Sequence, residues 1–105
     1  MSLLATSLPL PCVSPDVLTF AEEQGVSAYL PAVLAMTRRI FPTWPLKVFL
    51  EDDPEIADDW HIILEVQVPD DTVADALFAL DRQWVGEIFK HCPSTHVYIF
   101  RLGMA

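Results

Sequence analysis

The sequence predicts an α+β fold, a two-layer sandwich with the element order α-α-β-β-α-β in a single domain over residues 1–105. Three observations lead to this prediction. Residues 61–68 alternate their side chains between two faces, residues 73–88 carry an apolar stripe at helical spacing, and prolines separate the segments. Hydrophobic residues make up 52% of the chain and charged residues only 20%, so we expect a globular protein with a filled core.

Two helices are expected before the first strand. Residues 1–13 are predicted to be an irregular or flexible N-terminal segment, because prolines interrupt them. Ser14-Pro15-Asp16 is typical of a helix start, and Gly25 is typical of the left-handed residue that ends a helix. The next regular helix is predicted to begin near Leu30 and to end before Pro42.

Three strands and a third helix complete the expected order. Strands are predicted over 46–50, 61–68 and 96–102, and a helix over 73–88 that starts from a capping box at Thr72. The buried stripe of this helix is Val73, Leu77, Leu80, Trp84 and Ile88, widened by Phe78, Val85 and Phe89. Gly86 weakens the helix unless close packing requires it.

The strands are expected to form a three-stranded antiparallel sheet in the order 2-1-3. The first two strands should pair as a hairpin, and the helix over 73–88 should return the chain so that the third strand runs parallel to the second. The third strand would then lie beside strand 46–50 and run antiparallel to it. This places strand 46–50 at the centre, with the helices mainly on one face.

The charge of the chain limits its partners. Fifteen acidic residues against six Lys and Arg give a formal net charge of -9, which argues against nucleic acids and anionic membrane surfaces. It permits a basic protein partner, a cation, or a role in solubility alone. Two cysteines form no disulfide framework, so reduced thiols in a cytoplasmic protein are expected, with a Cys12–Cys92 bridge left open.

The most unusual feature is an acid segment over residues 51–59 between two predicted strands. It holds six carboxylates within nine residues and is followed by an aromatic residue. We interpret these side chains as candidates for binding a basic partner, since charge complementarity guides protein association and aromatics anchor interfaces. The candidates are Glu51, Asp52, Asp53, Glu55, Asp58, Asp59 and Trp60. The alternative for the acids is a solvated hairpin connection, and Ca²⁺ or Mg²⁺ binding lacks the spacing of an EF-hand loop.

Two further groups of residues are candidates. His91, Cys92 and His96 are of the types that bind transition metals, although the sequence offers no clear fourth ligand. The sheet face expected to carry Phe49, Ile63, Tyr98 and Phe100 would leave an apolar patch opposite the helices. A second copy of the chain or a partner protein could cover that patch, and the N-terminal segment or the first two helices are the alternative cover.

These observations favour a non-enzymatic protein–protein interaction module or a homo-oligomer subunit, without a cofactor. The alternative is a small metal-binding protein or enzyme that uses the carboxylates of residues 51–59 or the His91, Cys92 and His96 group. Glu51-Asp52-Asp53-Pro54-Glu55, placed between two strands, resembles segments of small bacterial proteins. The resemblance covers one short motif and implies no activity.

Overall fold

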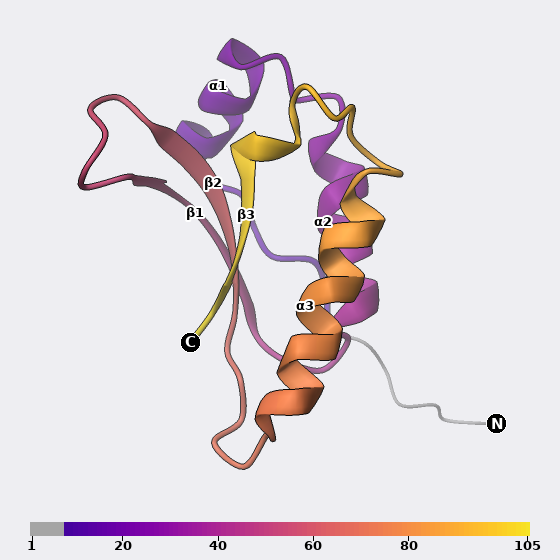
Figure 1. The fold of residues 1–105 in the computed structure, drawn as a ribbon. Coiled ribbons are helices and arrows are strands. Elements are labelled where there is room, and N and C mark those ends of the chain that lie inside the picture. Colours follow the sequence, from indigo (N-terminus) through magenta and orange to yellow (C-terminus); the bar gives the residue numbers. More distant parts are fainter. Residues whose placement is uncertain (1–7) are drawn as a thin grey trace, which may run out of the picture.

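A computed structural model describes residues 8–105, which form three helices, a short 3-10 helix and a three-stranded sheet (Figure 1). The α+β class and the element order are confirmed. The elements are α1 (Pro15–Glu23), α2 (Leu30–Ile40), β1 (Leu46–Asp52), β2 (Trp60–Val66), α3 (Ala74–Ile88), η1 (Val97–Ile99) and β3 (Phe100–Met104). Residues 8–13 belong to no helix or strand, as expected, and residues 1–7 of the predicted irregular segment lie outside the described residues.

The sheet is mixed, and its strand order is β1-β2-β3. β1 and β2 pair antiparallel as predicted, and β3 runs parallel to β2, also as predicted. The expected position of β3 beside β1 is wrong, because α3 crosses over and returns the chain directly beside β2. The burial of β2 agrees with its central position: five of its seven residues, including Ile62 and Ile63 on opposite faces, are buried.

One face of the sheet packs against the helices, so the fold has two layers (Figure 1). The register sets Leu50 beside Ile62 and Ile62 beside Phe100, and side chains two residues apart continue each row on the same face. The core joins these rows to apolar residues of all three helices. Examples of the buried helical residues are Val17, Ala21, Val33, Met36, Ile40, Trp84 and Ile88.

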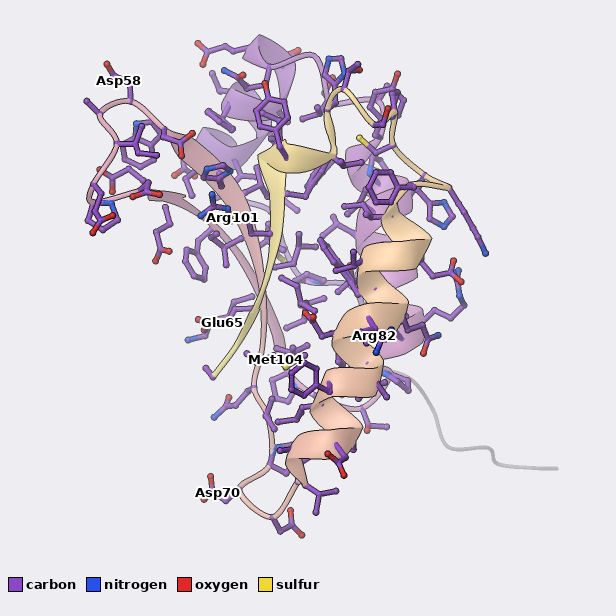
Figure 2. All side chains as sticks on the ribbon, viewed as in Figure 1. Asp58, Glu65, Asp70, Arg82, Arg101 and Met104 are labelled. Atoms are coloured by element: carbon purple, nitrogen blue, oxygen red, sulfur yellow. The ribbon has the colours of Figure 1, made fainter. Side chains whose placement is uncertain are left out.

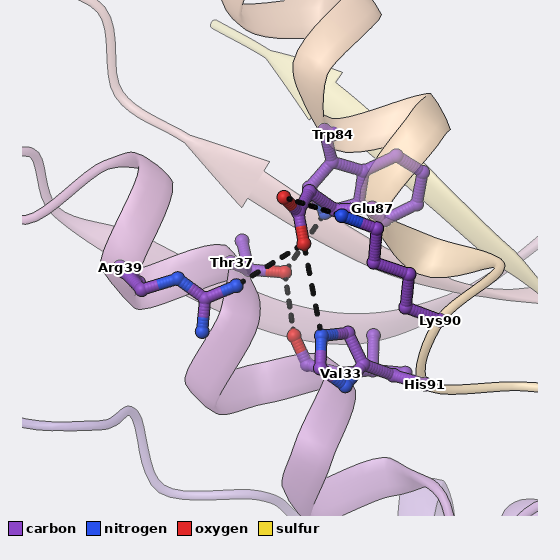
Figure 3. A network of polar contacts seen from close by, with 7 residues as sticks. All are labelled: Val33, Thr37, Arg39, Trp84, Glu87, Lys90 and His91. Atoms are coloured by element: carbon purple, nitrogen blue, oxygen red, sulfur yellow. Dashed lines mark hydrogen bonds and ion pairs between the residues drawn. The ribbon is translucent and has the colours of Figure 1, made fainter.

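A buried polar chain joins α2 to α3 (Figure 3). The indole Nε1 of Trp84 donates to Thr37 Oγ1 at 2.8 Å, and Thr37 Oγ1 donates to the Val33 carbonyl at 2.7 Å. At the surface of the same contact, the Glu87 carboxylate lies 3.3 Å from Arg39 Nη2 and 3.5 Å from Lys90 Nζ. The two helices are therefore fixed against each other by specific bonds as well as by apolar contact.

Several expected details of the third helix and last strand are wrong. Residues 97–99 form the 3-10 helix η1, and the strand follows at residues 100–104. α3 begins at Ala74 after Val73, with no side-chain hydrogen bond at its cap, so the capping box at Thr72 does not form. Of the stripe predicted to be buried, Val73, Phe78, Val85 and Phe89 are exposed. The helix is apolar on two sides, and periodicity alone does not tell which side packs.

Candidate functional site

A solvent-open groove lies between α1 and the hairpin that joins β1 to β2. Its volume is about 510 Å³, within the range of small-ligand and side-chain pockets. Its lining joins segments far apart in the sequence: Asp16, Thr19, Phe20, Glu23 and Gln24 from α1, Leu50 from β1, and Asp58 and Trp60 from the hairpin. The groove therefore brings two of the expected partner-binding residues, Asp58 and Trp60, next to a helix that the sequence did not connect with them.

The apolar part of the groove is formed by Phe20, Leu50 and Trp60. Trp60 opens β2 and is exposed, whereas Phe20 and Leu50 are partly buried and pack against the core. Trp60 shares the helix-facing side of β2 with Ile62, and α1 lies over this end of the sheet, so the indole forms part of a wall. An aromatic ring held this way presents a large apolar surface to a ligand.

Three carboxylates, those of Asp16, Glu23 and Asp58, surround this apolar part. Within residues 8–105, none of the three forms an ion pair with a basic side chain. A hydrogen bond from Ser14 lowers the pKa of the Asp16 carboxyl, so this group stays ionised well below neutral pH. The groove thus combines an apolar surface with an acidic rim, and no basic side chain of the described residues is paired with that rim.

The fold itself uses part of the acid segment. Asp53 Oδ1 accepts a hydrogen bond from the Glu55 amide at 2.8 Å, which forms an Asx turn. Asp58 adopts a positive φ of 61°, a conformation that Asp and Asn tolerate better than most residues. The interpretation as a hairpin connection is therefore confirmed for the backbone, and the side chains of Glu51, Asp52 and Glu55 are exposed.

His61 fastens the base of this hairpin and was not among the expected site residues. The ring is buried; Nδ1 lies 2.8 Å from the Tyr98 carbonyl, and Nε2 lies 2.9 Å from Asp59 Oδ2. These two contacts hold the ring between η1 and the end of the hairpin. The only sequence signal was a histidine two residues after an aspartate, within an apolar strand.

The His91, Cys92 and His96 side chains are directed to different partners. His91 Nε2 lies 3.9 Å from Glu87, and His96 Nδ1 lies 2.8 Å from the Thr95 hydroxyl. Cys92 is buried, and burial raises the pKa of its thiol, which disfavours the thiolate that metals bind. Among residues 8–105, no three His, Cys, Asp or Glu side chains are placed to hold a metal ion. Cys12 is exposed, and both thiols are free.

The residues expected on the open sheet face are divided by the structure. Phe49 and Ile63 are register partners on the face away from the helices, as predicted. Phe100 is a correction: it pairs with Ile62 and is buried in the core on the opposite face. Tyr98 belongs to η1 and is exposed. Arg101 and Glu65 lie on the open face with Ile63, so this face is mixed in character (Figure 2).

Comparison with known proteins adds no assignment. No family model, curated protein or solved structure matches this chain. Over the part of the chain that the structure describes, no helix combines the length and apolar character needed to cross a membrane.

Proposed function

We propose that this protein is a non-enzymatic interaction module that binds a basic segment of a partner protein in the groove between α1 and the hairpin. The observation that carries the proposal is the combination in one groove of the Trp60 ring, partly buried apolar neighbours, and three carboxylates that have no basic partner among residues 8–105. Such a groove matches an arginine or lysine side chain, which has an apolar stem and a cationic head.

Apolar contact, cation–π stacking and charge would contribute to binding through different residues of the groove. The stem of an arginine would lie on Phe20 and Leu50, and its guanidinium would stack on Trp60 in a cation–π contact. The carboxylates of Asp16, Glu23 and Asp58 would accept charge-assisted hydrogen bonds from the same head group or from a neighbouring basic residue. The net charge of -9 would attract a basic partner over longer distances and raise the association rate at low salt.

The test uses a blocked peptide of alternating arginine and leucine and a control peptide with glutamate in place of arginine. Binding is followed through the indole resonance of Trp60 in two-dimensional NMR spectra of the full chain. We expect the arginine peptide to shift this resonance and the glutamate peptide to leave it unchanged. Raising the salt concentration should weaken the interaction, because the charges are exposed to solvent.

A matched pair of variants separates the groove from net charge. Glu23→Gln/Asp58→Asn removes two charges at the groove, and Asn retains the tolerance for positive φ that position 58 requires. Asp70→Asn/Asp71→Asn removes two charges from the connection before α3, at the other end of the molecule from Asp58 (Figure 2). We expect about tenfold weaker binding for the first pair, or about 1.4 kcal/mol, and about twofold or less for the second.

The Trp60→Leu variant keeps an apolar side chain and removes the ring. We expect it to weaken binding of the arginine peptide roughly two- to fivefold, the range of an exposed cation–π contact. Equal losses for the two charge pairs would contradict the proposal, since binding would then follow net charge alone. So would a peptide that binds without any change at Trp60.

A further inference from the structure

We propose that α3 pairs antiparallel with α3 of a second copy of this chain. The surface concerned is the outward stripe of α3, formed by Phe78, Arg82, Val85 and Phe89. The three apolar members are 69%, 47% and 54% exposed in chain order. Trp84 and Ile88 are buried in the core on another side of the helix, so the outward stripe has no partner among residues 8–105.

The spacing of the outward stripe is that of a helix–helix seam. Its members follow each other at steps of four, three and four residues, the a and d pattern by which two helices interlock their side chains. Figure 2 shows Arg82 on α3, on the side of the molecule away from the hairpin that carries Asp58. An apolar stripe of this regularity on an exposed helix is typical of an interaction face.

Small residues beside the stripe favour a close approach of another helix. Ala79 and Gly86 are both exposed and lie seven residues apart, so they fall on one flank of the stripe. No non-neighbouring atom lies within 4 Å of the position that a Cβ at Gly86 would take. Glycine weakens a helix, and nothing packed against Gly86 in the described fold requires it. A second helix that approaches closely at this flank supplies a reason for it.

The charges along α3 identify the occupant as a second copy in antiparallel orientation. Asp75 lies in the first turn and Lys90 lies just beyond the last turn, while Arg82 lies between them. An antiparallel pair that sets Phe78 against Phe89 of the other copy also brings each Asp75 near the other Lys90. A parallel pair in register would instead place Asp75 level with Asp75 and Lys90 level with Lys90, so this contact between opposite charges would not form.

The surroundings of Lys90 and Asp75 agree with this arrangement. Lys90 lies 3.5 Å from Glu87 of the same chain, a contact between side chains at the surface that leaves the ammonium accessible. Asp75 forms no ion pair within residues 8–105. Two-fold symmetry makes the Asp75–Lys90 contact twice and sets the two helix dipoles in opposite directions, both of which favour the antiparallel form over other self-pairings.

The first experiment is sedimentation velocity of the full chain over a concentration series, with native mass spectrometry as a second readout. We expect a concentration-dependent dimer. Phe78→Glu should reduce dimer formation at least tenfold, whereas Tyr98→Glu, which alters an exposed aromatic outside α3, should leave it unchanged. Circular dichroism checks that each variant is folded.

The second experiment tests the orientation by charge reversal. Asp75→Lys should weaken the dimer at least tenfold at low salt, because the substituted side chain then meets Lys90 of the other copy with the same charge. The double variant Asp75→Lys/Lys90→Asp should restore it. These two charge variants leave the outward stripe intact, so they still test the proposal if Phe78→Glu does not fold.

Three outcomes would overturn the proposal. The first is a wild-type chain that stays monomeric throughout the series. The second is a dimer that survives Phe78→Glu but is lost in Phe49→Lys, which would move the contact to the open sheet face. The third is a failure of the double charge reversal to restore a dimer that Asp75→Lys weakens.

Discussion

Arg38 and Arg39 are neighbours in sequence, yet the structure gives them very different energetic weight. Arg38 is 7% exposed, and its Nη1 donates to the Phe41 carbonyl at 2.9 Å and to the Trp44 carbonyl at 2.7 Å. The Arg39 side chain is 59% exposed and contacts Glu87 at 3.3 Å. Replacing each in turn by Met keeps an apolar stem of similar length and removes the charge, so the two variants form a matched pair.

The magnitudes follow from the contacts that are lost. A hydrogen bond from a charged group contributes about 1.5–3 kcal/mol, and Arg38 makes two of them to carbonyls of the connection that follows α2. Burial lowers the pKa of the Arg38 guanidinium, which reflects the cost of removing the cation from water and reduces the net gain. We therefore expect Arg38→Met to lower the free energy of unfolding by about 2–4 kcal/mol, and Arg39→Met by about 0–1 kcal/mol.

Urea denaturation followed by tryptophan fluorescence measures both variants against the wild type. In thermal melts the same difference corresponds to roughly 10–25 °C for Arg38→Met and a few degrees for Arg39→Met. Arg38→Lys should fall between them, since one ammonium does not reproduce the fork of a guanidinium. Equal destabilisation by the two Met variants would refute the reasoning, because burial and the two carbonyl contacts would then carry no weight.

Two further predictions concern the core. Thr37→Val keeps the shape of the side chain but leaves the buried Trp84 indole without its acceptor; it should cost about 1–3 kcal/mol in urea denaturation, and more than Thr37→Ser, which keeps the hydroxyl. Burial raises the pKa of the Cys92 thiol from its ordinary value of 9.0, so the folded state holds this proton more tightly than the unfolded state. The stabilising contribution of the protonated thiol is present below about pH 9 and is lost as pH rises through the folded-state pKa. The free energy of unfolding measured from pH 7 to 10.5 should therefore fall more steeply for the wild type than for Cys92→Ala. Parallel pH dependences of the two proteins would contradict this.

The class of fold could be predicted from the sequence, because hydrophobic periodicity and the prolines that separate the segments are local properties. The alternation around Ile62 and Leu64 predicted a strand and its core-facing side, and the register bears this out. The strand order was not accessible in the same way. β3 would run in the same direction whether it paired antiparallel with β1 or parallel with β2. Only the burial of β2 on both faces shows that β2 is the central strand. The 3-10 helix at residues 97–99 was missed because its apolar residues also fit a strand.

Only part of the candidate site could be predicted from the sequence. The acid segment and Trp60 were found because their charge and position are unusual along the chain. Phe20 and Glu23 were not found, because an amphipathic helix does not reveal which distant segment its edge will meet. The exposed stripe of α3 was assigned to the core for a related reason. Leu77 and Phe78 are adjacent apolar residues of one helix. Only the packing of α2 against Trp84 shows which side of that helix faces the core.

The two proposed interfaces lie on different parts of the molecule, and this has a measurable consequence. The groove is formed at the hairpin and α1, while the outward stripe belongs to α3, on another side (Figures 1 and 2). A dimer through α3 would therefore leave both grooves open and would present two acidic sites in a fixed relation. A partner with two basic segments would then bind more tightly than one with a single segment, because the second contact is intramolecular. Phe78→Glu should remove this gain while it leaves the affinity for a single basic segment unchanged. A variant that lost both at once would show that the groove depends on the dimer, and the two proposals would no longer be independent.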